Sequence, residues 1–292
     1  MSLYLYCLRE PSGTPPGTCP APGGACHALS VIQSHGVNGT GGVFVCDFEG
    51  VEAVIGKINT DDFAEIQKKA QEDIQWIREK AVAHEMVIEE AMGLSRSKRD
   101  KMTNNLSPVI PVKFGVIFDT EKRLAEVISE QSAAINATFD RIRTKQEWSV
   151  KLFLKDTQKF RDQVRKESEQ LSEKSKTFAA LPAGRAYFME EELNEELERE
   201  CSRMLDEEAV NAFEELKPFA AEATLVKILD SKLTGRSERM ILNSAYLVAN
   251  DHLPEFEKNV SKMCEKMAER GFLLEQGGPW PIYHFTEFSN ES

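Results

Sequence analysis

Residues 277–285 read GGPWPIYHF and lie a few residues before the end of the chain. The two glycines free the backbone, and the two prolines then stiffen it into an extended path. That path carries three large apolar groups, on Trp280, Tyr283 and Phe285. Burying one such side chain contributes about 1.5–3 kcal/mol, whereas a terminal segment frays unless it is tied down. The tail, residues 277–292, is therefore expected either to dock on the protein's own surface or to bind a partner.

The composition is that of an ordinary globular protein, with 292 residues, 41% of them hydrophobic and 29% charged, which is long enough for two cores. A formal net charge of -12 argues against nucleic-acid binding and against docking on anionic lipid, because both need a basic surface. No apolar run approaches the roughly 18 residues of a membrane span, and the N-terminus lacks a signal-peptide pattern. The sequence therefore predicts a cytoplasmic protein that binds neither nucleic acid nor membrane.

Cysteines crowd the start of the chain, where His27 and His35 accompany them. Cys19 and Cys26 are too far apart for the Cys-x2-4-Cys spacing of a zinc knuckle. The cysteines at positions 7 and 46 lie in apolar, strand-like runs and are expected to be small buried hydrophobic residues with reduced thiols. No metal site is predicted.

The first half of the chain predicts an α+β domain over residues 1–143. Short β-type runs predict strands at residues 3–8, 29–33, 43–46, 51–58 and 109–118. Pro111 and Gly115 interrupt the last run, so a bent or edge strand is expected there. From Thr60 onward, apolar residues recur every three or four positions, which predicts a long amphipathic helix that ends near Gly93. A second helix follows it.

The second half, residues 144–292, predicts the order strand, helical excursion, strand, strand, helix, strand. That is the ferredoxin-like βαββαβ order, with a long helical hairpin at about residues 155–217 in place of its first helix. The strands are expected at residues 147–155, 223–233, 240–248 and 272–275. The tail completes this domain. The predicted fold class is thus α+β with two domains, the second a modified ferredoxin-like domain with an extended C-terminal tail.

Motifs for catalysis are absent from the sequence, which has no H-E-x-x-H, nucleophile elbow, P-loop or dinucleotide fingerprint. Residues 35–42, HGVNGTGG, lack the Gly-Lys-Ser/Thr ending of a phosphate loop and are expected to form a hairpin connection. The glutamates of residues 190–200 lack the Glu-x-x-His pairs of a di-iron bundle and are expected to form a solvated helix face. His84, on the apolar stripe of the first helix, is expected to be a hydrogen-bonded core residue. Large aromatic groups without catalytic ones indicate a binding or assembly protein with no cofactor.

Several segments, each weak alone, follow one another in a recognisable order. They are Tyr4-Leu5-Tyr6, His84 with Val87, residues 109–115 (VIPVKFG), Glu147-Trp148 with Lys151, Gly184 with Ala186-Tyr187, residues 242–248 (LNSAYLV) and residues 278–285 (GPWPIYHF). With them the chain resembles the gas vesicle protein GvpL/GvpF family over nearly its whole length. Cys7 stands where the family usually has glycine, and Ile282 where it usually has a second proline.

The resemblance implies a cytoplasmic, gas-vesicle-associated protein needed to form gas vesicles, the gas-filled protein shells that give cells buoyancy. It also implies a two-domain α+β fold with a modified ferredoxin domain, and no enzyme activity. The expected partners are the major gas vesicle shell protein and other gas vesicle accessory proteins. Two roles stay open, an accessory protein that binds the shell protein during assembly and a permanent minor component of the wall. An enzyme with an unrecognised site between the domains is a third hypothesis, without a motif in its favour.

The contact with the shell protein is expected at a sheet edge or groove near residues 240–248, bordered by the tail. No catalytic, cofactor-binding or metal-binding residue is predicted. The candidate residues for partner binding or tail docking are Asn243, Tyr246, Pro279, Trp280, Tyr283 and Phe285.

Overall fold

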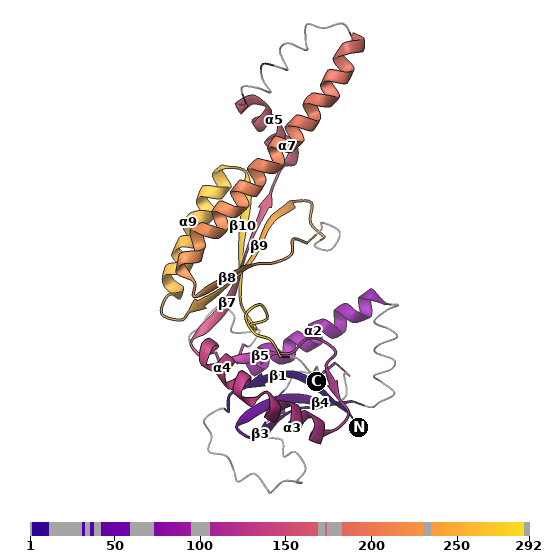
Figure 1. Ribbon diagram of the computed structural model, residues 1–292, viewed down its shortest axis with the longest axis vertical. Coiled ribbons are helices and arrows are strands. Elements are labelled where there is room, and N and C mark those ends of the chain that lie inside the picture. Colours follow the sequence, from indigo (N-terminus) through magenta and orange to yellow (C-terminus); the bar gives the residue numbers. More distant parts are fainter. Residues whose placement is uncertain are drawn as a thin grey trace. The chain divides into compact units, whose positions relative to one another are not determined.

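The computed structural model describes residues 2–11, 31–32, 36–37, 42–58, 73–94, 106–168, 173, 183–229 and 235–288 (Figure 1). These residues form a mixed α+β structure with two separate β-sheets. The chain divides into two compact units. The first unit comprises Met1–Glu147 with Pro279–Ser292, and the second comprises Trp148–Gly278.

The sheet of the first unit is built around strand β1 (Ser2–Arg9), whose residues from Ser2 to Leu8 are all buried. The other strands are β2 (Val31–Ile32), β3 (Val43–Phe48), β4 (Val51–Ile58), β5 (Val109–Pro111) and β6 (Ile117–Phe118). Their order is β2-β3-β4-β1-β5, with β6 also paired to β1. A strand buried on both faces needs an almost continuous apolar run, and that is what the LYLYCL sequence supplies.

Two turns of this sheet follow from glycine. Glu49 and Gly50 join β3 to β4 and both have positive φ, 53° and 89°, which is the backbone of a type I′ hairpin turn. Gly115, with φ of 92°, lies between β5 and β6. The predicted strand at residues 109–118 is therefore two short strands that both pair with β1, and its expected bend is confirmed.

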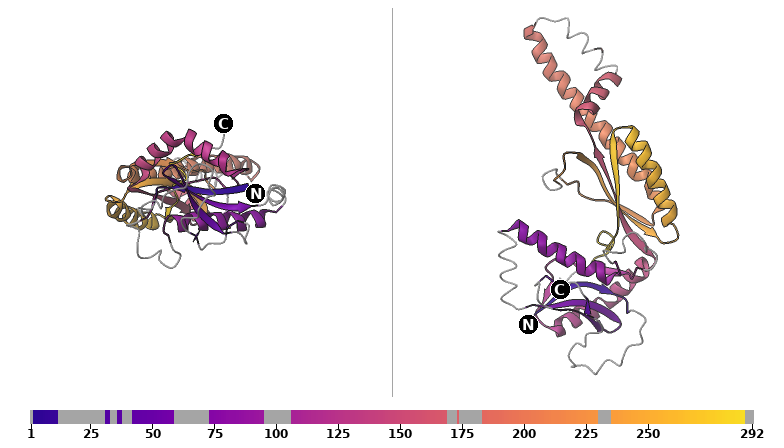
Figure 2. Two further views of the ribbon diagram at one scale, coloured as in Figure 1. Left: turned by 90° about the horizontal axis from the view of Figure 1, so that it is seen from below. Right: turned by 180° about the vertical axis from the view of Figure 1, so that it is seen from behind.

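Helices cover both faces of this sheet, with α2 (Ile74–Ala91) on one side and α3 (Glu121–Glu130) and α4 (Ser132–Ile142) on the other (Figure 2). Asp73 caps α2 by accepting a hydrogen bond from the Trp76 N–H at 3.0 Å. The start predicted at Thr60 lies outside the described residues. The second predicted helix is interrupted at Gln131, where φ is -99° and ψ is 5°, so that it forms two helices.

The second unit holds a four-stranded sheet in the order β10-β7-β9-β8. Its elements are β7 (Lys145–Leu154), α5 (Thr157–Glu167), α7 (Ala183–Leu216), the short 3-10 helix η1 (Lys217–Phe219), β8 (Glu222–Leu225), β9 (Arg239–Ala249), α9 (Leu253–Glu269) and β10 (Phe272–Trp280). Helices α7 and α9 lie on one face of this sheet (Figure 1). The core between them is built from buried residues such as Tyr246, Phe256 and Leu216.

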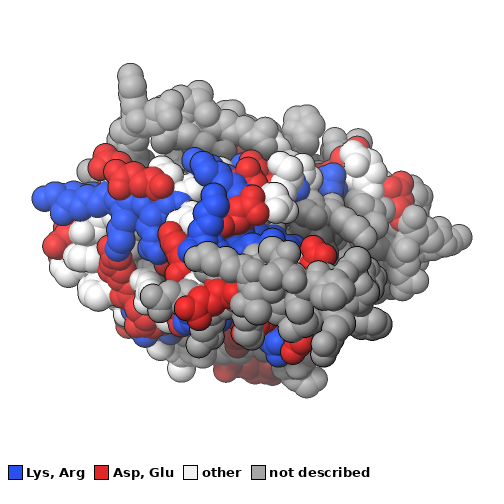
Figure 3. Space-filling model, turned by 90° about the horizontal axis from the view of Figure 1, so that it is seen from above, with Lys and Arg blue, Asp and Glu red and all other residues white. Residues whose placement is uncertain are grey.

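Helices α5 and α7 form a hairpin with an apolar cluster of its own, which consists of Val164, Leu193, Leu197 and Cys201. The glutamates at positions 190–192 and 195 are exposed, which confirms the predicted solvated face. Farther along α7, Arg203 pairs with Glu200 at 2.6 Å and also with Glu207. Seen from above, basic and acidic side chains are interspersed over the described surface (Figure 3).

Several sequence predictions need correction. The strand expected at residues 223–233 ends at Leu225, and residues 226–229 form no strand. The strand expected at residues 272–275 extends to Trp280, because β10 is an edge strand, where a proline is tolerated. Cys46, expected to be a reduced thiol, is disulfide-bonded. The described tail residues from Pro279 to Phe288 cluster with the first unit, whereas the sequence placed them with the second domain.

Candidate functional site

Polar contacts from three elements of the first unit hold the tail in place. The hydroxyl group of Tyr283 donates to Glu85 Oε2 at 2.8 Å. The backbone N–H of His284 donates to Glu147 Oε2 at 3.0 Å, and its Nδ1 donates to Oε1 of the same carboxylate at 2.6 Å. Arg141 also donates to the carbonyl oxygen of Phe285. These bonds hold the tail against α2, α4 and the start of β7.

Apolar burial adds to these contacts, since Ile282, Phe285 and Phe288 are all buried. Tyr283 is half-buried and packs against the apolar cluster that contains Tyr4 and Tyr6. Trp280, at the end of β10, is also half-buried, and Pro279 is buried. Of the six candidate residues, the structure therefore brings together the four that lie in the tail.

Burial and neighbouring carboxylates set the protonation of Tyr283 and His284 in the tail. The Glu147 side chain is only 3% exposed, and its carboxylate raises the pKa of His284 above the usual value of 6.5. Burial raises the pKa of Tyr283, and the nearby charge of Glu85 raises it further. The tyrosine thus stays protonated and acts as a donor, while Glu147 accepts two hydrogen bonds from one tail residue.

Removing the Tyr283 hydroxyl is expected to destabilise the first unit. A hydrogen bond to a charged group contributes about 1.5 kcal/mol at the low end of the usual range, and Glu85 is half-buried. We expect Tyr283→Phe to cost roughly that amount in chemical denaturation at neutral pH. Tyr246→Phe is the control, because its buried hydroxyl contacts only uncharged groups, the Phe213 carbonyl at 3.4 Å and the Ser244 side chain. An equal cost for the two variants would contradict this account of the tail.

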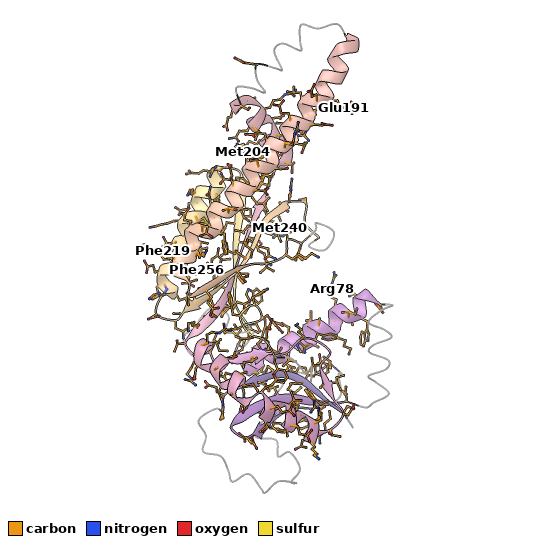
Figure 4. The ribbon with its side chains drawn as sticks, in the orientation of Figure 1. Arg78, Glu191, Met204, Phe219, Met240 and Phe256 are labelled. Carbon is orange, nitrogen blue, oxygen red and sulfur yellow. The ribbon has the colours of Figure 1, made fainter. Side chains whose placement is uncertain are left out.

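The remaining two candidate residues lie on β9, which is an interior strand of its sheet. Tyr246 is fully buried beneath α7 and α9, and Asn243 is buried as well. The sheet edge expected near residues 240–248 is therefore not on this strand, near whose start Met240 lies (Figure 4). Asn243 instead acts on the neighbouring edge, since its Nδ2 donates to the Lys227 carbonyl oxygen at 2.9 Å.

That edge carries apolar side chains in contact with solvent. Leu225, Ile228 and Leu229 are 60%, 50% and 38% exposed, and they fall within five successive positions. The other large exposed hydrophobic residues of the described chain, Val82 and Val210, are isolated. We call residues 222–229 the β8 edge segment. Scattered apolar residues need no explanation, so this local group is the candidate contact surface of the second unit.

His84 belongs to a closed hydrogen-bond network, as predicted for a core histidine. Its Nε2 lies 3.0 Å from the Val112 carbonyl oxygen, which can only accept, so Nε2 carries the proton. Its Nδ1 therefore accepts from the Tyr4 hydroxyl at 3.0 Å, and that hydroxyl in turn accepts from the Gly115 N–H. Burial lowers the pKa of His84 to about 4. With both ring nitrogens engaged, His84 has no atom left for a substrate.

No group of three or more His, Cys, Asp and Glu side chains that could hold a metal ion occurs among the residues that the structure describes. Within the same residues, no helix is long and apolar enough to cross a membrane. The two histidines and two cysteines between positions 19 and 35 lie outside the described residues, as does most of the 35–42 loop.

These features define a class, a two-sheet α+β protein with hydrogen-bonded polar clusters and an exposed apolar sheet edge. The chain belongs to the gas vesicle synthesis protein GvpL/GvpF family, whose model matches residues 2–287. This confirms the resemblance found in the sequence. Family membership places the protein among those that act in gas vesicle formation.

Solved structures of gas vesicle proteins share the fold. The crystal structure of GvpF from Anabaena sp. PCC7120 matches with a TM-score of 0.69 at 19% identity, covering 99% of each chain. That of GvpF from Microcystis aeruginosa matches with a TM-score of 0.62 at 18% identity, covering 98% of this chain and 99% of the other. At these identities the likeness establishes the fold alone. No curated protein matches the sequence.

Proposed function

We propose that this protein is a non-enzymatic accessory or minor structural protein that binds the major gas vesicle shell protein during assembly. Family membership supports the process. The observation that carries the binding role is the group of exposed apolar side chains in the β8 edge segment, on a chain whose net charge is -12. A shell protein with a water-avoiding face associates indiscriminately before it enters the wall. A charged partner that covers this face and later releases it keeps the subunit available for assembly.

The six candidate residues take two roles in this proposal. Pro279, Trp280, Tyr283 and Phe285 keep the tail in place and so preserve the first unit. Asn243 and Tyr246 are positioning residues, because both are buried on β9. Through its bond to Lys227, Asn243 fixes the backbone of the β8 edge segment.

We also propose that the two units correspond to the two domains predicted from the sequence, 1–143 and 144–292, apart from the tail. The connection order β7, helical hairpin, β8, β9, α9, β10 supports a modified ferredoxin-like fold for the second of them. The proposed location is cytoplasmic and associated with gas vesicles, alongside other gas vesicle accessory proteins as further partners.

Co-expression tests the binding role directly. The full chain, carrying an affinity tag, is produced together with the major shell protein, and the shell protein recovered with it is quantified by immunoblot. We expect the shell protein in the eluate when the tagged chain is present and none when the tag is fused to an unrelated acidic protein. Absence of the shell protein from the eluate under gentle conditions would overturn the proposal.

The permanence of the association is tested on purified vesicles washed in urea. An accessory protein that acts only during assembly is expected to be absent from the washed vesicles. A permanent wall component is expected to remain, or to leave, in a fixed ratio to the shell protein. Counting copies per vesicle by quantitative mass spectrometry separates these two roles.

A further inference from the structure

We propose that the outer edge of β8 binds an extended, uncharged apolar segment of the shell protein by backbone pairing, so that the bound segment becomes a fifth strand of the sheet. The inference rests on the proposed function and adds the surface and the mode of binding. Strand β8 is the last strand in the order β10-β7-β9-β8, so within the described chain only its inner side is paired. An unpaired strand edge is a template for another strand.

The register of β8 on β9 shows which backbone groups point outward. Leu225 pairs with Ser244, and the next residue, Val226, donates its N–H to the Asn243 carbonyl oxygen at 2.8 Å. In an antiparallel pair, hydrogen-bonded and non-hydrogen-bonded positions alternate. The N–H and C=O groups of Leu225 and, two residues earlier, Ala223 therefore point away from β9. The Leu225 carbonyl has only a 3.4 Å contact with the Thr224 hydroxyl, which leaves it able to accept a better bond.

Asn243 extends this edge beyond the strand itself. By donating to the Lys227 carbonyl oxygen at 2.9 Å, its side chain holds the chain against β9 after β8 has ended. The exposed side chains of Leu225, Ile228 and Leu229 lie along this fixed stretch. A paired strand would bury them while the outward backbone groups set its direction.

Charge identifies the occupant. The only charged residue from Leu225 to Leu229 is Lys227, so an uncharged apolar strand meets no opposing charge there. A second copy of this chain would bring another net charge of -12 and repel the first. The edge therefore fits an uncharged apolar segment of a partner, which under the proposed function is the shell protein.

Three variants of the full chain test the inference by the same co-expression and recovery of the shell protein. Leu225→Pro removes one outward N–H group, which the sheet itself does not use. The double variant Leu225→Lys with Ile228→Lys keeps the backbone but places two charges on the edge. Val210→Lys is the matched control, because Val210 is a similarly exposed apolar residue on α7. Circular dichroism checks that each variant keeps the wild-type fold.

We expect both edge variants to lower recovery of the shell protein by about tenfold or more, as loss of a central contact does, and Val210→Lys to leave it within about twofold. If the wild type binds and the edge variants bind as well, the inference is wrong while the proposed function stands. If the wild type itself recovers no shell protein, both fail. Should light scattering show a dimer that Leu225→Lys dissociates, the occupant is a second copy and the inference is overturned. Because Leu225 and Ile228 are exposed, the double lysine variant is expected to fold even where the proline variant does not.

Discussion

Ending the chain at Gln276 is expected to unfold the first unit while leaving the second folded. The truncation removes the buried side chains of Ile282, Phe285 and Phe288, whose burial together contributes about 5–9 kcal/mol. It also strips the buried carboxylate of Glu147 of its two bonds from His284. A typical domain is stable by only about 5–15 kcal/mol, so this loss consumes most or all of the stability.

Hydrogen exchange with mass spectrometry measures the effect unit by unit. We expect the amides of β1 to lose their protection in the truncated chain, whereas those of β9, an interior strand of the second unit, keep it. A chain that ends at Phe288 is the control, since it retains every described tail residue and should exchange like the wild type. If the amides of β1 are equally protected from exchange with and without the tail, the tail does not stabilise the first unit and this prediction is wrong.

A truncated chain is therefore a poor test of shell-protein binding. Truncation removes part of a folded core, so loss of shell-protein recovery by the truncated chain would report unfolding rather than a lost contact. Substitutions at exposed positions such as Leu225 avoid the problem. Tyr283→Phe lies between these extremes, because it changes one hydrogen bond and keeps the ring.

The sequence predicted the elements that depend on local pattern. The apolar run of β1, the β-prone runs of β3 and β4 and the core position of His84 all follow from the spacing of residues near one another. The family resemblance was also visible, because its segments occur in order along the chain. What the sequence missed are pairings between distant residues, such as Tyr283 with Glu85, which are 198 positions apart. Nothing in the sequence around Tyr283 or around Glu85 indicates that these two residues pair.

The β8 edge segment shows a second limit of prediction from the sequence, which concerns where a strand ends. Residues 223–229 (ATLVKIL) are mostly apolar and β-prone, which predicts a longer strand whether the run is buried or exposed. Strand β8 ends at Leu225, one further backbone bond joins Val226 to Asn243 of β9, and the side chains of Ile228 and Leu229 lie in solvent. The hydrophobic pattern indicates that such a run prefers to be buried. It does not indicate whether the protein's own core or a partner buries it.

Replacing His84 with glutamine is expected to remove a large part of the acid sensitivity of the first unit. Burial lowers the pKa of His84 from 6.5 to about 4, so between these values the unfolded chain binds a proton that the folded chain excludes. The contribution of neutral His84 to the free energy of unfolding is therefore complete above pH 6.5 and falls as the pH drops toward 4. At 1.36 kcal/mol per pKa unit, the total loss is about 3 kcal/mol, of which about 2 kcal/mol is lost by pH 5.

Urea denaturation of wild type and His84→Gln at pH 7 and pH 5 measures this difference. The variant is expected to be less stable at pH 7, because the ring is packed among Tyr4, Tyr6 and Phe114. Its further loss on going to pH 5 should nevertheless be smaller than that of the wild type by about 2 kcal/mol. The exposed His252, at the start of α9, supplies the control substitution His252→Gln, which should leave the wild-type difference unchanged.

His284, the other histidine that the structure describes in the first unit, acts in the opposite direction, so variants must be compared rather than the wild-type curve alone. Glu147 raises the pKa of His284, so the contribution of His284 is complete below pH 6.5 and declines as the pH rises through its folded value. Acidification thus weakens the core around His84 while the tail contact of His284 keeps its full strength. If His84→Gln and the wild type lose equal stability between pH 7 and pH 5, the histidine is not excluded from protonation in the folded state, and the closed network around it is wrong.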